Sequence, residues 1–204
     1  MRIGPKYKIC KRLGASVFEK CQTQKFQLAE ARSPRRISRG RRGGGGAYGA
    51  QLLEKQKARF TYGLSETQFS RYAREAMEKR GIDSSQGLVT RLESRLDNVV
   101  FRAGFVKTRR AARQLVSHGH ITVNGKRMNV PSYLVAPEDV VAIRQESRQS
   151  PLFAGRTEAS KEYQAPKWIT VNEDGHAATM KTTPVFAESE LSWSPTIIIQ
   201  FYSR

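Results

Sequence analysis

The chain has 204 residues, enough for one domain or two small ones, and its 36 Lys and Arg against 18 Asp and Glu give a formal net charge of +18. No apolar run approaches the ~20 residues that span a bilayer, and the N-terminus lacks the apolar stretch of a signal peptide, so we expect no membrane partner. Residues 1–62 hold 16 basic and 3 acidic side chains, whereas residues 145–204 hold 6 and 7. This basic excess indicates a nucleic acid as the partner.

The first 46 residues are basic and contain few apolar side chains. The apolar positions between Ile9 and Phe18 allow only one or two short amphipathic turns. Gly43–Gly46 are four consecutive glycines, which lose much conformational entropy when they are ordered. We therefore expect residues 1–46 to form a basic arm that becomes ordered on RNA, with a flexible linker as the alternative.

Two helices are predicted next. Residues 48–62 form the first, with Lys55 on a wetter side, and Gly63 ends it. Ser65 caps the second helix, with Gln68 three residues later as in a capping box. The apolar stripe of this second helix has helical spacing and is interpreted as core rather than as a platform for stacked bases: Phe69, Tyr72, Ala73, Ala76 and Met77.

Two further short helices are predicted before a hairpin. The first of them has an apolar stripe from Val89 to Val100, and Gly104 can end it. Thr108 can cap the second, which buries alanines, Leu115 and Val116. The arginines of this helix then lie on or beside the opposite face, where no core needs them.

Asn124-Gly125 predicts a tight hairpin, because a type I′ turn needs positive φ at both central positions. A two-residue loop pairs Val123 with Lys126 and Ile121 with Met128. Val140–Ile143 can add a strand, and a second hairpin in the same sheet is predicted over 167–171 and 177–180. The apolar residues 197–202 have the composition of a buried strand or of a tail packed on the helical domain.

The residues from 91 to 143 resemble the small alpha-L RNA-binding motif. This motif occurs in ribosomal small-subunit protein four, in some pseudouridine synthases and in bacterial tyrosyl-tRNA synthetases. The matching segments are RLDNVV at 95–100, Thr108-Arg109, ARQLV at 112–116, HGHI at 118–121 and VNG at 123–125. Nearly the whole chain is similar to bacterial-type ribosomal small-subunit protein four, most weakly in 20–46 and 146–190, and the similarity outside the motif rests on segments at 4–6, 11–14, 48–57, 62–69 and 197–203.

The resemblance implies the domain organisation and fold class. The family packs its C-terminal tail back against its N-terminal helices, so that the RNA-binding module is inserted into the first domain. We expect an α+β protein with a basic arm (1–46), an all-helical domain (47–90) completed by the tail (188–204), and the alpha-L module with a small, mainly antiparallel sheet (91–187).

The resemblance also implies the function and the partners. The family is a structural constituent of the small ribosomal subunit that binds the 5′ domain of 16S-type ribosomal RNA early in assembly. It neighbours proteins five and three of the subunit and lines the mRNA entrance tunnel, where basic residues contribute to decoding accuracy. Arg41 and Arg42 match basic positions of that segment, whereas Gly44 stands where the family often has a further arginine. The expected location is a bacterial cytoplasmic ribosome or an organellar one.

These comparisons and the charge pattern select the residues expected to contact RNA. They are mostly basic or hydrogen-bonding side chains on the predicted helices, turns and arm: Lys6, Lys11, Arg12, Arg35, Arg36, Arg41, Arg42, Tyr48, Gln51, Lys55, Lys57, Arg59, Tyr62, Arg71, Arg74, Arg91, Arg95, Arg102, Lys107, Thr108, Arg109, Arg110, Arg113, Gln114, Ser117, His118, His120, Asn124 and Lys126. Arg41 and Arg42 are also the positions expected to meet mRNA.

No cofactor or metal site is predicted. Cys10 and Cys21 have no C-x-x-C spacing and make no disulfide framework, which indicates a reducing compartment. Some members of the family carry four cysteines in this region and bind a metal, but this sequence lacks two of them. Asp97 lies close to Arg95 and Arg102, so an ion pair is its preferred interpretation.

We expect no enzymatic activity, because the sequence has no phosphate-binding loop, nucleotide fingerprint or catalytic set. The alternatives are an RNA-modifying enzyme or synthetase that uses the module as an anchor, and a stand-alone RNA-binding module. The first needs a catalytic domain of a hundred or more residues, for which the sequence leaves no room, and the second would lack residues 1–85. A DNA-binding helix-turn-helix protein fits less well, because a hairpin follows the helix at 108–118 directly.

Overall fold

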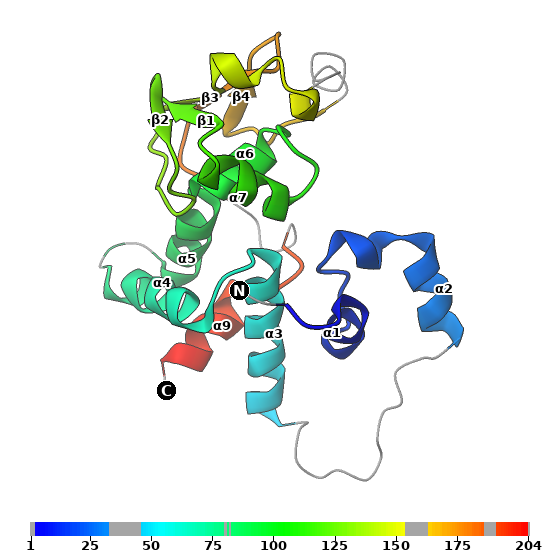
Figure 1. Ribbon diagram of the computed structural model, residues 1–204. Helices are drawn as coiled ribbons and strands as arrows, with labels where there is room; N and C mark the ends of the chain where they lie inside the picture. The colour runs from blue at the N-terminus through cyan, green and yellow to red at the C-terminus, as the bar shows by residue number, and fades with distance from the viewer. Residues whose placement is uncertain are drawn as a thin grey trace. The chain divides into compact units, whose positions relative to one another are not determined.

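A computed structural model of the chain describes residues 3–32, 46–79, 81, 83–153, 163–185 and 191–203 (Figure 1). The chain divides into two compact units. Unit 1 comprises Met1–Leu88 and Phe186–Arg204, and unit 2 comprises Val89–Val185. Unit 1 contains helices in its described part, whereas unit 2 combines helices with a five-stranded antiparallel sheet. The predicted α+β class is therefore confirmed.

Residues 3–32 differ from the expected arm, because they fold into short helices around a small core. The helices are α1 (Lys6–Leu13), the 3-10 helix η1 (Glu19–Gln22) and α2 (Gln24–Arg32). Phe18 and Phe26 are buried together with both cysteines, and Phe60 packs against them, with its ring centroid 6.0 Å from that of Phe18. A few aromatic side chains thus form a small core in a segment whose basic composition did not predict one. The expected arm residues 33–45 lie outside the described part.

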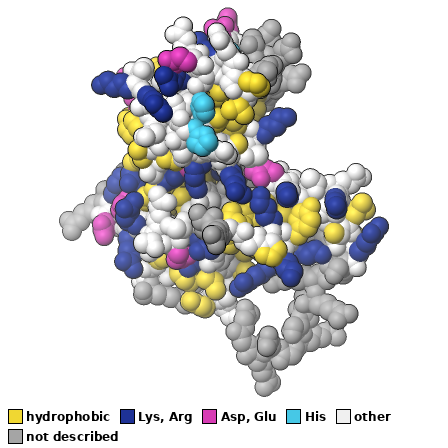
Figure 2. Space-filling view, in the orientation of Figure 1, with side chains coloured by type: hydrophobic (Ala, Val, Ile, Leu, Met, Phe, Trp, Pro, Cys, Tyr) yellow, Lys and Arg dark blue, Asp and Glu magenta, His cyan; other side chains and the backbone are white. Residues whose placement is uncertain are grey.

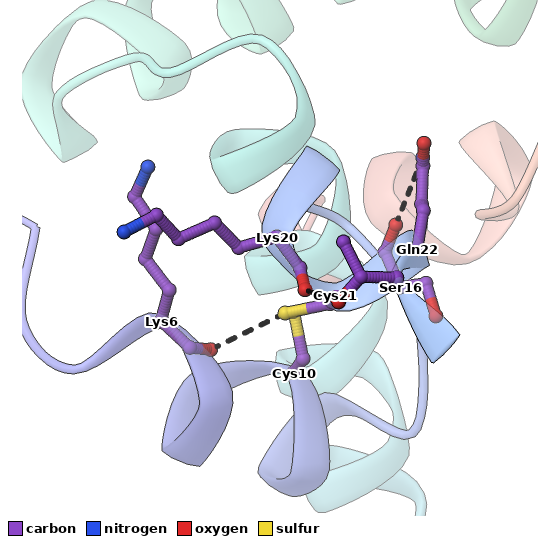
Figure 3. The surroundings of a disulfide bond; sticks show 7 residues. Lys6, Cys10, Ser16, Lys20, Cys21 and Gln22 are labelled. Carbon is purple, nitrogen blue, oxygen red and sulfur yellow. Dashed lines mark hydrogen bonds between the residues drawn. A yellow bond between two sulfur atoms is a disulfide. The ribbon is translucent and has the colours of Figure 1, made fainter. Parts of the chain in front are cut away.

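Cys10 and Cys21 form a disulfide, which the spacing of the two cysteines did not predict (Figure 3). The chain reverses between α1 and η1 and brings the two Cα atoms to 6.6 Å, within the range that a disulfide spans. The carbonyl oxygen of Lys6 lies 3.7 Å from Cys21 Sγ, and the side-chain amide of Gln22 donates a hydrogen bond of 3.5 Å to the Ser16 carbonyl. The disulfide therefore closes the turn that leads from α1 into η1.

The described part of unit 1 also contains the start of α5 (Ser84–Glu93) and three complete helices: α3 (Ala47–Thr61), α4 (Glu66–Glu78) and α9 (Pro195–Tyr202). Gly63 has φ 61° after α3, and the Ser65 hydroxyl accepts a 3.3 Å hydrogen bond from the Gln68 backbone N–H, which confirms the predicted boundary and cap. The aromatic stripe of α4 is buried, as predicted.

The C-terminal residues form a helix that packs on the helical domain, so of the two alternatives the structure shows the packed tail and not the buried strand. Ser194 caps this helix, α9, by accepting a hydrogen bond from the Ile197 N–H, and Pro195 occupies its first turn. Proline suits that position because its fixed φ is helical and its missing N–H is not needed there. α9 packs on both α3 and α4 (Figure 1). This contact supports the helix despite its three consecutive isoleucines, which have a modest helix propensity.

The single helix predicted over residues 89–103 is two helices, α5 (Ser84–Glu93) and α6 (Leu96–Arg102), and the division between the units falls within α5. Arg95 is extended, with ψ 137°, and forms an isolated bridge with Leu134. The backbone N–H of Val135 donates to the Ser94 carbonyl at 2.9 Å. Pairing of residues 94–95 with the 133–135 segment thus interrupts the helix. The apolar stripe nevertheless continues from α5 into α6, which is why the sequence pattern predicted one helix.

The hairpins and their register are confirmed. The strands are β1 (Ile121–Val123), β2 (Lys126–Met128), β3 (Val140–Ile143), β4 (Ile169–Val171) and β5 (Ala177–Met180), in the sheet order β2-β1-β3-β5-β4. Ile121 pairs with Met128 and Val123 with Lys126. Asn124 and Gly125 have φ 50° and 78°, as a type I′ turn requires.

Helices α6 and α7 (Arg109–Ser117) pack on each other and lie on one side of the sheet (Figure 1). Thr108 caps α7 by accepting a 3.0 Å hydrogen bond from the Ala111 N–H, as predicted. Two short 3-10 helices, η2 (Gln145–Ser147) and η3 (Pro151–Phe153), follow β3. The core between helices and sheet is formed by fully buried aliphatic side chains: Leu92, Leu96, Val100, Val116, Ile121, Val141, Ile143 and Met180.

Candidate nucleic-acid interface

Two buried carboxylates organise the basic side chains of unit 2. Glu93 ends α5 and is fully buried, and Asp97 lies in the first turn of α6 with 3% of its surface exposed. A carboxylate that loses water in this way needs cationic or hydrogen-bonding partners. Four arginines supply them, and we call this set, with Asn98, the arginine–carboxylate cluster: Glu93, Asp97, Asn98, Arg95, Arg102, Arg109 and Arg113.

Glu93 fixes Arg102 and Arg109 through one carboxylate. Arg102 binds it with two parallel hydrogen bonds, Nε to Oε2 at 3.0 Å and Nη2 to Oε1 at 2.8 Å. Arg109 Nη2 lies 3.9 Å from Oε1, and the Nε of Arg109 donates to the side-chain oxygen of Asn98 at 2.7 Å. The Asn98 amide in turn donates to Glu93 Oε2. The carboxylate therefore holds two guanidinium groups and the amide that braces one of them.

Asp97 holds the other two arginines. Arg95 donates to it with Nε and Nη2 at 3.0 and 2.8 Å, and Arg113 donates with Nε at 2.8 Å and lies 2.6 Å away with Nη2. The predicted ion pair of Asp97 with Arg95 is thus present. The other candidate partner, Arg102, binds Glu93 instead, and Arg113 from α7 is the second arginine on Asp97.

The four arginines of the cluster differ in how far their side chains are exposed to solvent. The Arg95 side chain is 3% exposed, whereas those of Arg102, Arg109 and Arg113 are 25%, 22% and 33% exposed. Each of these three planar guanidinium groups is held along one edge by a carboxylate or amide and is partly open to solvent. With four guanidinium groups around two carboxylates, the cluster keeps an excess of positive charge, and such forks match phosphate oxygens.

The prediction that the arginines of α7 lie where no core needs them holds only for Arg110. Arg109 and Arg113 belong to the cluster, while Arg110, Gln114 and Ser117 are exposed. These three are spaced at i, i+4 and i+7 and form one row along the helix. We call them the outer row. It presents a cation, an amide and a hydroxyl on the face opposite the buried Ala112, Leu115 and Val116.

The structure places the predicted RNA-binding residues in four groups. Those exposed are Arg12, Tyr48, Arg71, Arg74, Lys107, Arg110, Gln114, Ser117, His118, Asn124 and Lys126. Those partly buried are Lys6, Lys11, Lys57, Arg59, Arg91, Arg102, Thr108, Arg109, Arg113 and His120. Those buried are Gln51, Lys55, Tyr62 and Arg95. Arg35, Arg36, Arg41 and Arg42 lie outside the described residues.

The buried positions and one exposed position make contacts within the fold. Lys55, expected on a wet side of α3, lies under α9, with its Nζ 2.7 Å from Glu66 Oε1 and 4.4 Å from the Phe201 ring centroid. Asn124 is exposed, but its side chain donates to Asp139 Oδ1 at 2.7 Å and accepts from the Val140 N–H at 2.9 Å. We therefore leave these residues, with Gln51, Tyr62 and Arg95, out of the interface proposed below.

Glu66 connects α3, α4 and α9 of unit 1. Burial alone would raise the pKa of this carboxyl, but hydrogen bonds from Lys55 and Tyr202, and the charges of Lys55 and Arg59, outweigh burial and lower its pKa. Burial, followed by the neighbouring Glu66 charge, raises the pKa of Tyr202, whose hydroxyl donates to Glu66 Oε1 at 3.0 Å. The ionised carboxylate is therefore the form that this packing stabilises.

Sequence reasoning missed two features of the candidate interface. Arg127 is exposed on β2, and its Nη2 donates to the His118 carbonyl at 3.5 Å. The alternation of side chains along the strands could have predicted this exposure. Ile121 and Val123 point to the buried face of the hairpin, so Thr122 and its partner Arg127 point to the other face. Glu93 was also missed, although its spacing four residues after Val89 and three before Leu96 places it beside the apolar stripe, where a charge needs buried partners.

The described part of the chain shows no group of three or more His, Cys, Asp or Glu side chains placed to hold a metal. Within the same residues, no helix is long and apolar enough to cross a membrane.

The chain matches known families over most of its length. Residues 1–93 match the ribosomal protein S4/S9 N-terminal domain and residues 94–141 match the S4 domain. Proteins named small ribosomal subunit protein uS4 are similar throughout. Those of Natranaerobius thermophilus and Thermotoga petrophila are 42% and 43% identical, with 98% of this chain and of each relative covered. That of Polaromonas naphthalenivorans is 40% identical, with 99% of this chain and 98% of the relative covered. The resemblance inferred from the sequence motifs is thereby confirmed, and the chain belongs to the family of small ribosomal subunit protein uS4.

Proposed function

We propose that the chain is a structural protein of the small ribosomal subunit that binds ribosomal RNA through unit 2. The arginine–carboxylate cluster is the observation that carries this proposal. It orients three partly exposed guanidinium groups before any ligand arrives, so that little side-chain entropy is lost when they meet phosphates. The outer row and the exposed Lys107, Lys126 and Arg127 extend the basic surface on the same unit.

The mechanism is recognition by charge and shape. Arginines and lysines that neutralise phosphates release condensed counterions, which makes binding steeply dependent on salt. Double-stranded RNA is recognised mostly through its shape, its phosphates and its 2′-hydroxyls, and rigid guanidinium forks suit such a target. Hydrogen-bonding groups on the outer row, such as Gln114, add contacts to sugars or to unpaired bases.

The finer assignment rests on the resemblance of the sequence. We propose that the target is the 5′ domain of the small-subunit ribosomal RNA, bound early in assembly, with proteins five and three of the subunit as neighbours. Arg41 and Arg42 are proposed to reach mRNA at the entrance tunnel and to contribute to decoding accuracy. The location follows from the ribosome, in the bacterial cytoplasm or in an organelle.

The chain is not an enzyme, as a member of a family of ribosomal proteins. Of the alternatives, the RNA-modifying enzyme is therefore set aside, and the general RNA anchor remains as the competing outcome of a binding experiment. A general anchor would bind any structured RNA equally, whereas an assembly protein discriminates.

The test compares two RNAs of equal length, a fragment that spans the 5′ domain of small-subunit ribosomal RNA and a generic duplex, across a salt series. We expect the ribosomal fragment to bind several orders of magnitude more tightly. With ~6–10 phosphate contacts, its affinity should fall about a thousandfold or more between 50 and 200 mM salt. Equal binding of the two RNAs would overturn the assembly role and leave a general anchor.

A further inference from the structure

A small pocket opens beside α7 in unit 2 and is not explained by phosphate binding. Its volume is about 150 Å³. Its walls are aliphatic side chains, among them Leu115 and Leu152, and its polar groups are Gln114, His118 and His120. Figure 2 shows histidine side chains next to a hydrophobic patch on the face in view. A phosphate or a metal cation would gain little from such walls.

The size and the chemistry of this pocket fit one nucleobase. Pockets for drug-sized ligands span ~300–1,000 Å³, so this one suits only a single flat ring system. A base has two apolar faces and a hydrogen-bonding edge, and unpaired RNA bases are bound by stacking on side chains that include histidine while polar groups contact the edge. Leu152 is 65% exposed, so an inserted ring would also cover aliphatic surface that is now in contact with water.

One of the two histidines that line the pocket, His120, is held in place before any ligand arrives. His120 Nδ1 lies at hydrogen-bonding distance, 2.9 Å, from the hydroxyl of the buried Ser147. Its ring also packs edge-on against Phe153, with centroids 6.4 Å apart and planes at 70°. These two contacts from η2 and η3 set the orientation of the imidazole. The ring of His118 lies 6.1 Å from that of His120 and is more exposed.

The surroundings of the pocket supply the charge that a nucleotide needs. Gln114 belongs to the outer row, together with the exposed Arg110. Lys107 and Arg110 directly follow and precede the lining residues Val106 and Ala111 in the chain, and both are exposed. A base that enters the pocket would therefore leave its phosphates on the cationic side of α7. The apolar depression and the basic helix face are thus parts of one nucleotide-sized site.

We propose that this pocket receives one unpaired base of the bound ribosomal RNA, with Gln114 and the two histidines at the base edge and the aliphatic side chains against its face. This inference rests on the proposed function and deepens it, because it adds a base-reading subsite to an interface otherwise made of phosphate contacts.

The test uses the full chain, the 5′-domain RNA fragment and three pocket variants. Leu152→Ala and Gln114→Ala alter exposed side chains and leave the core intact, while Ala111→Phe fills the pocket. Ala136→Phe is the matched control, because Ala136 is an exposed alanine in a loop of the same unit. Affinity is measured across salt, and the chemical reactivity of each unpaired base is mapped with and without protein.

We expect Ala111→Phe to weaken binding by about tenfold or more, because the apolar face of one base is no longer buried against the aliphatic side chains. The slope of affinity against salt should stay unchanged, because no phosphate contact is removed. A single unpaired base should be protected by the unaltered chain and lose its protection with Ala111→Phe and Gln114→Ala, but not with Ala136→Phe.

Two outcomes separate this inference from the proposed function. If the unaltered chain does not prefer the ribosomal fragment, the proposed function fails. If it does, and the three pocket variants keep both the affinity and the protection pattern, the base pocket alone is overturned. Should Ala111→Phe be misfolded by circular dichroism, Leu152→Ala and Gln114→Ala decide the matter, since their side chains are exposed.

Discussion

Each unit contains a group of ion pairs, and the two groups have opposite patterns of burial. In unit 1 the cation is hidden, since the Lys55 side chain is 8% exposed while its partner Glu66 is 43% exposed. In unit 2 the acids are hidden, since Glu93 and Asp97 are 0% and 4% exposed while their partners Arg102 and Arg113 are 25% and 33% exposed. In each group one partner is buried, and the other keeps part of its side chain in contact with solvent.

The difference teaches how basic residues should be assigned in such a chain. Lys55 and Arg102 look equally suited to RNA in the sequence, yet the Arg102 side chain is 25% exposed and that of Lys55 only 8%. A buried acid with partly exposed arginines can orient cations toward an anionic partner. A buried lysine under aromatic side chains, as with Phe201 and Tyr202, fastens one helix to another. The two tryptophans allow this contrast to be measured, because Trp168 lies buried in unit 2 and Trp193 lies buried in unit 1.

The largest effect is expected from Glu93→Gln, which removes the fully buried charge of the cluster. Breaking a buried ion pair costs about 3–5 kcal/mol, because the remaining partners stay partly desolvated. We expect this loss in the free energy of unfolding of unit 2, measured by denaturant titration of Trp168 fluorescence in a Trp193→Phe background. RNA affinity should fall as well, since Arg102 and Arg109 lose their orientation.

The matched control for Glu93→Gln is Glu146→Gln. Glu146 is an exposed acid of unit 2 that pairs with Arg144 at 2.6 Å, and its removal should leave both the stability and the RNA affinity of the chain unchanged. Equal effects of the two substitutions would mean that burial of the acid does not distinguish the cluster from a surface pair.

A smaller effect is expected from Glu66→Gln in unit 1. Lys55 then keeps its buried position without its carboxylate partner, and Tyr202 loses a charged acceptor. Hydrogen bonds to charged groups contribute about 1.5–3 kcal/mol, and we expect the lower part of that range because Glu66 is partly exposed. Trp193 fluorescence in a Trp168→Phe background reports the loss.

The control here is Glu78→Gln, at an exposed position in the last turn of α4, which should change stability by less than about 0.5 kcal/mol. RNA affinity should be the same in both variants. A large loss of RNA binding by Glu66→Gln would break the comparison, because it would give the unit 1 group a role at the interface.

The pH dependence of unit 1 should reveal the same carboxylate. Because the pKa of folded Glu66 is below its ordinary value of 4.5, folding favours the ionised form. This contribution is complete above the ordinary pKa and is lost as the pH falls through the lowered folded value. Unfolding of the unaltered chain and of Glu66→Gln, followed by Trp193 between pH 6 and pH 3, should therefore converge at the acidic end. A constant difference across that range would contradict the assigned shift.

The smallest effect on the fold is expected from Arg110→Gln in the outer row. The side chain is exposed, so stability should remain within about 0.5 kcal/mol of the unaltered chain. Removal of one phosphate contact should weaken binding to all RNAs alike and reduce the salt slope by about one. Lys181→Gln, at an exposed lysine just after β5, is the control with no expected change. An unchanged slope with Arg110→Gln would exclude this residue from the phosphate contacts.

Local signals in the sequence predicted the elements whose cause is local. The Asn124-Gly125 turn and the Ser65 and Thr108 caps depend on a few adjacent residues, and each was found at its predicted place. The sheet register followed from the turn and the alternation of side chains. The motifs also identified the family, because so many ordered matches at fixed spacing rarely coincide by chance.

The features that the sequence did not reveal depend on contacts between distant segments. The break at Arg95 is caused by pairing with residue 134, and the burial of Lys55 is caused by a helix more than a hundred residues away. The helical state of residues 195–202 is decided by packing on α3 and α4, which outweighs the preference of isoleucine for strands. Likewise, the core of residues 3–32 requires a chain reversal that brings Phe18 and Phe26 together.

The position of α9 at the far end of the chain has a consequence for biosynthesis. Unit 2 is continuous in sequence, so all its elements are available once residue 185 has emerged during translation. Unit 1 begins earlier but lacks the helix that covers Lys55 until residues 195–202 have been made. The usual order, in which N-terminal domains mature first, is therefore reversed. We expect unit 2 to be able to fold on the nascent chain before unit 1, because unit 1 is incomplete until α9 has been synthesised.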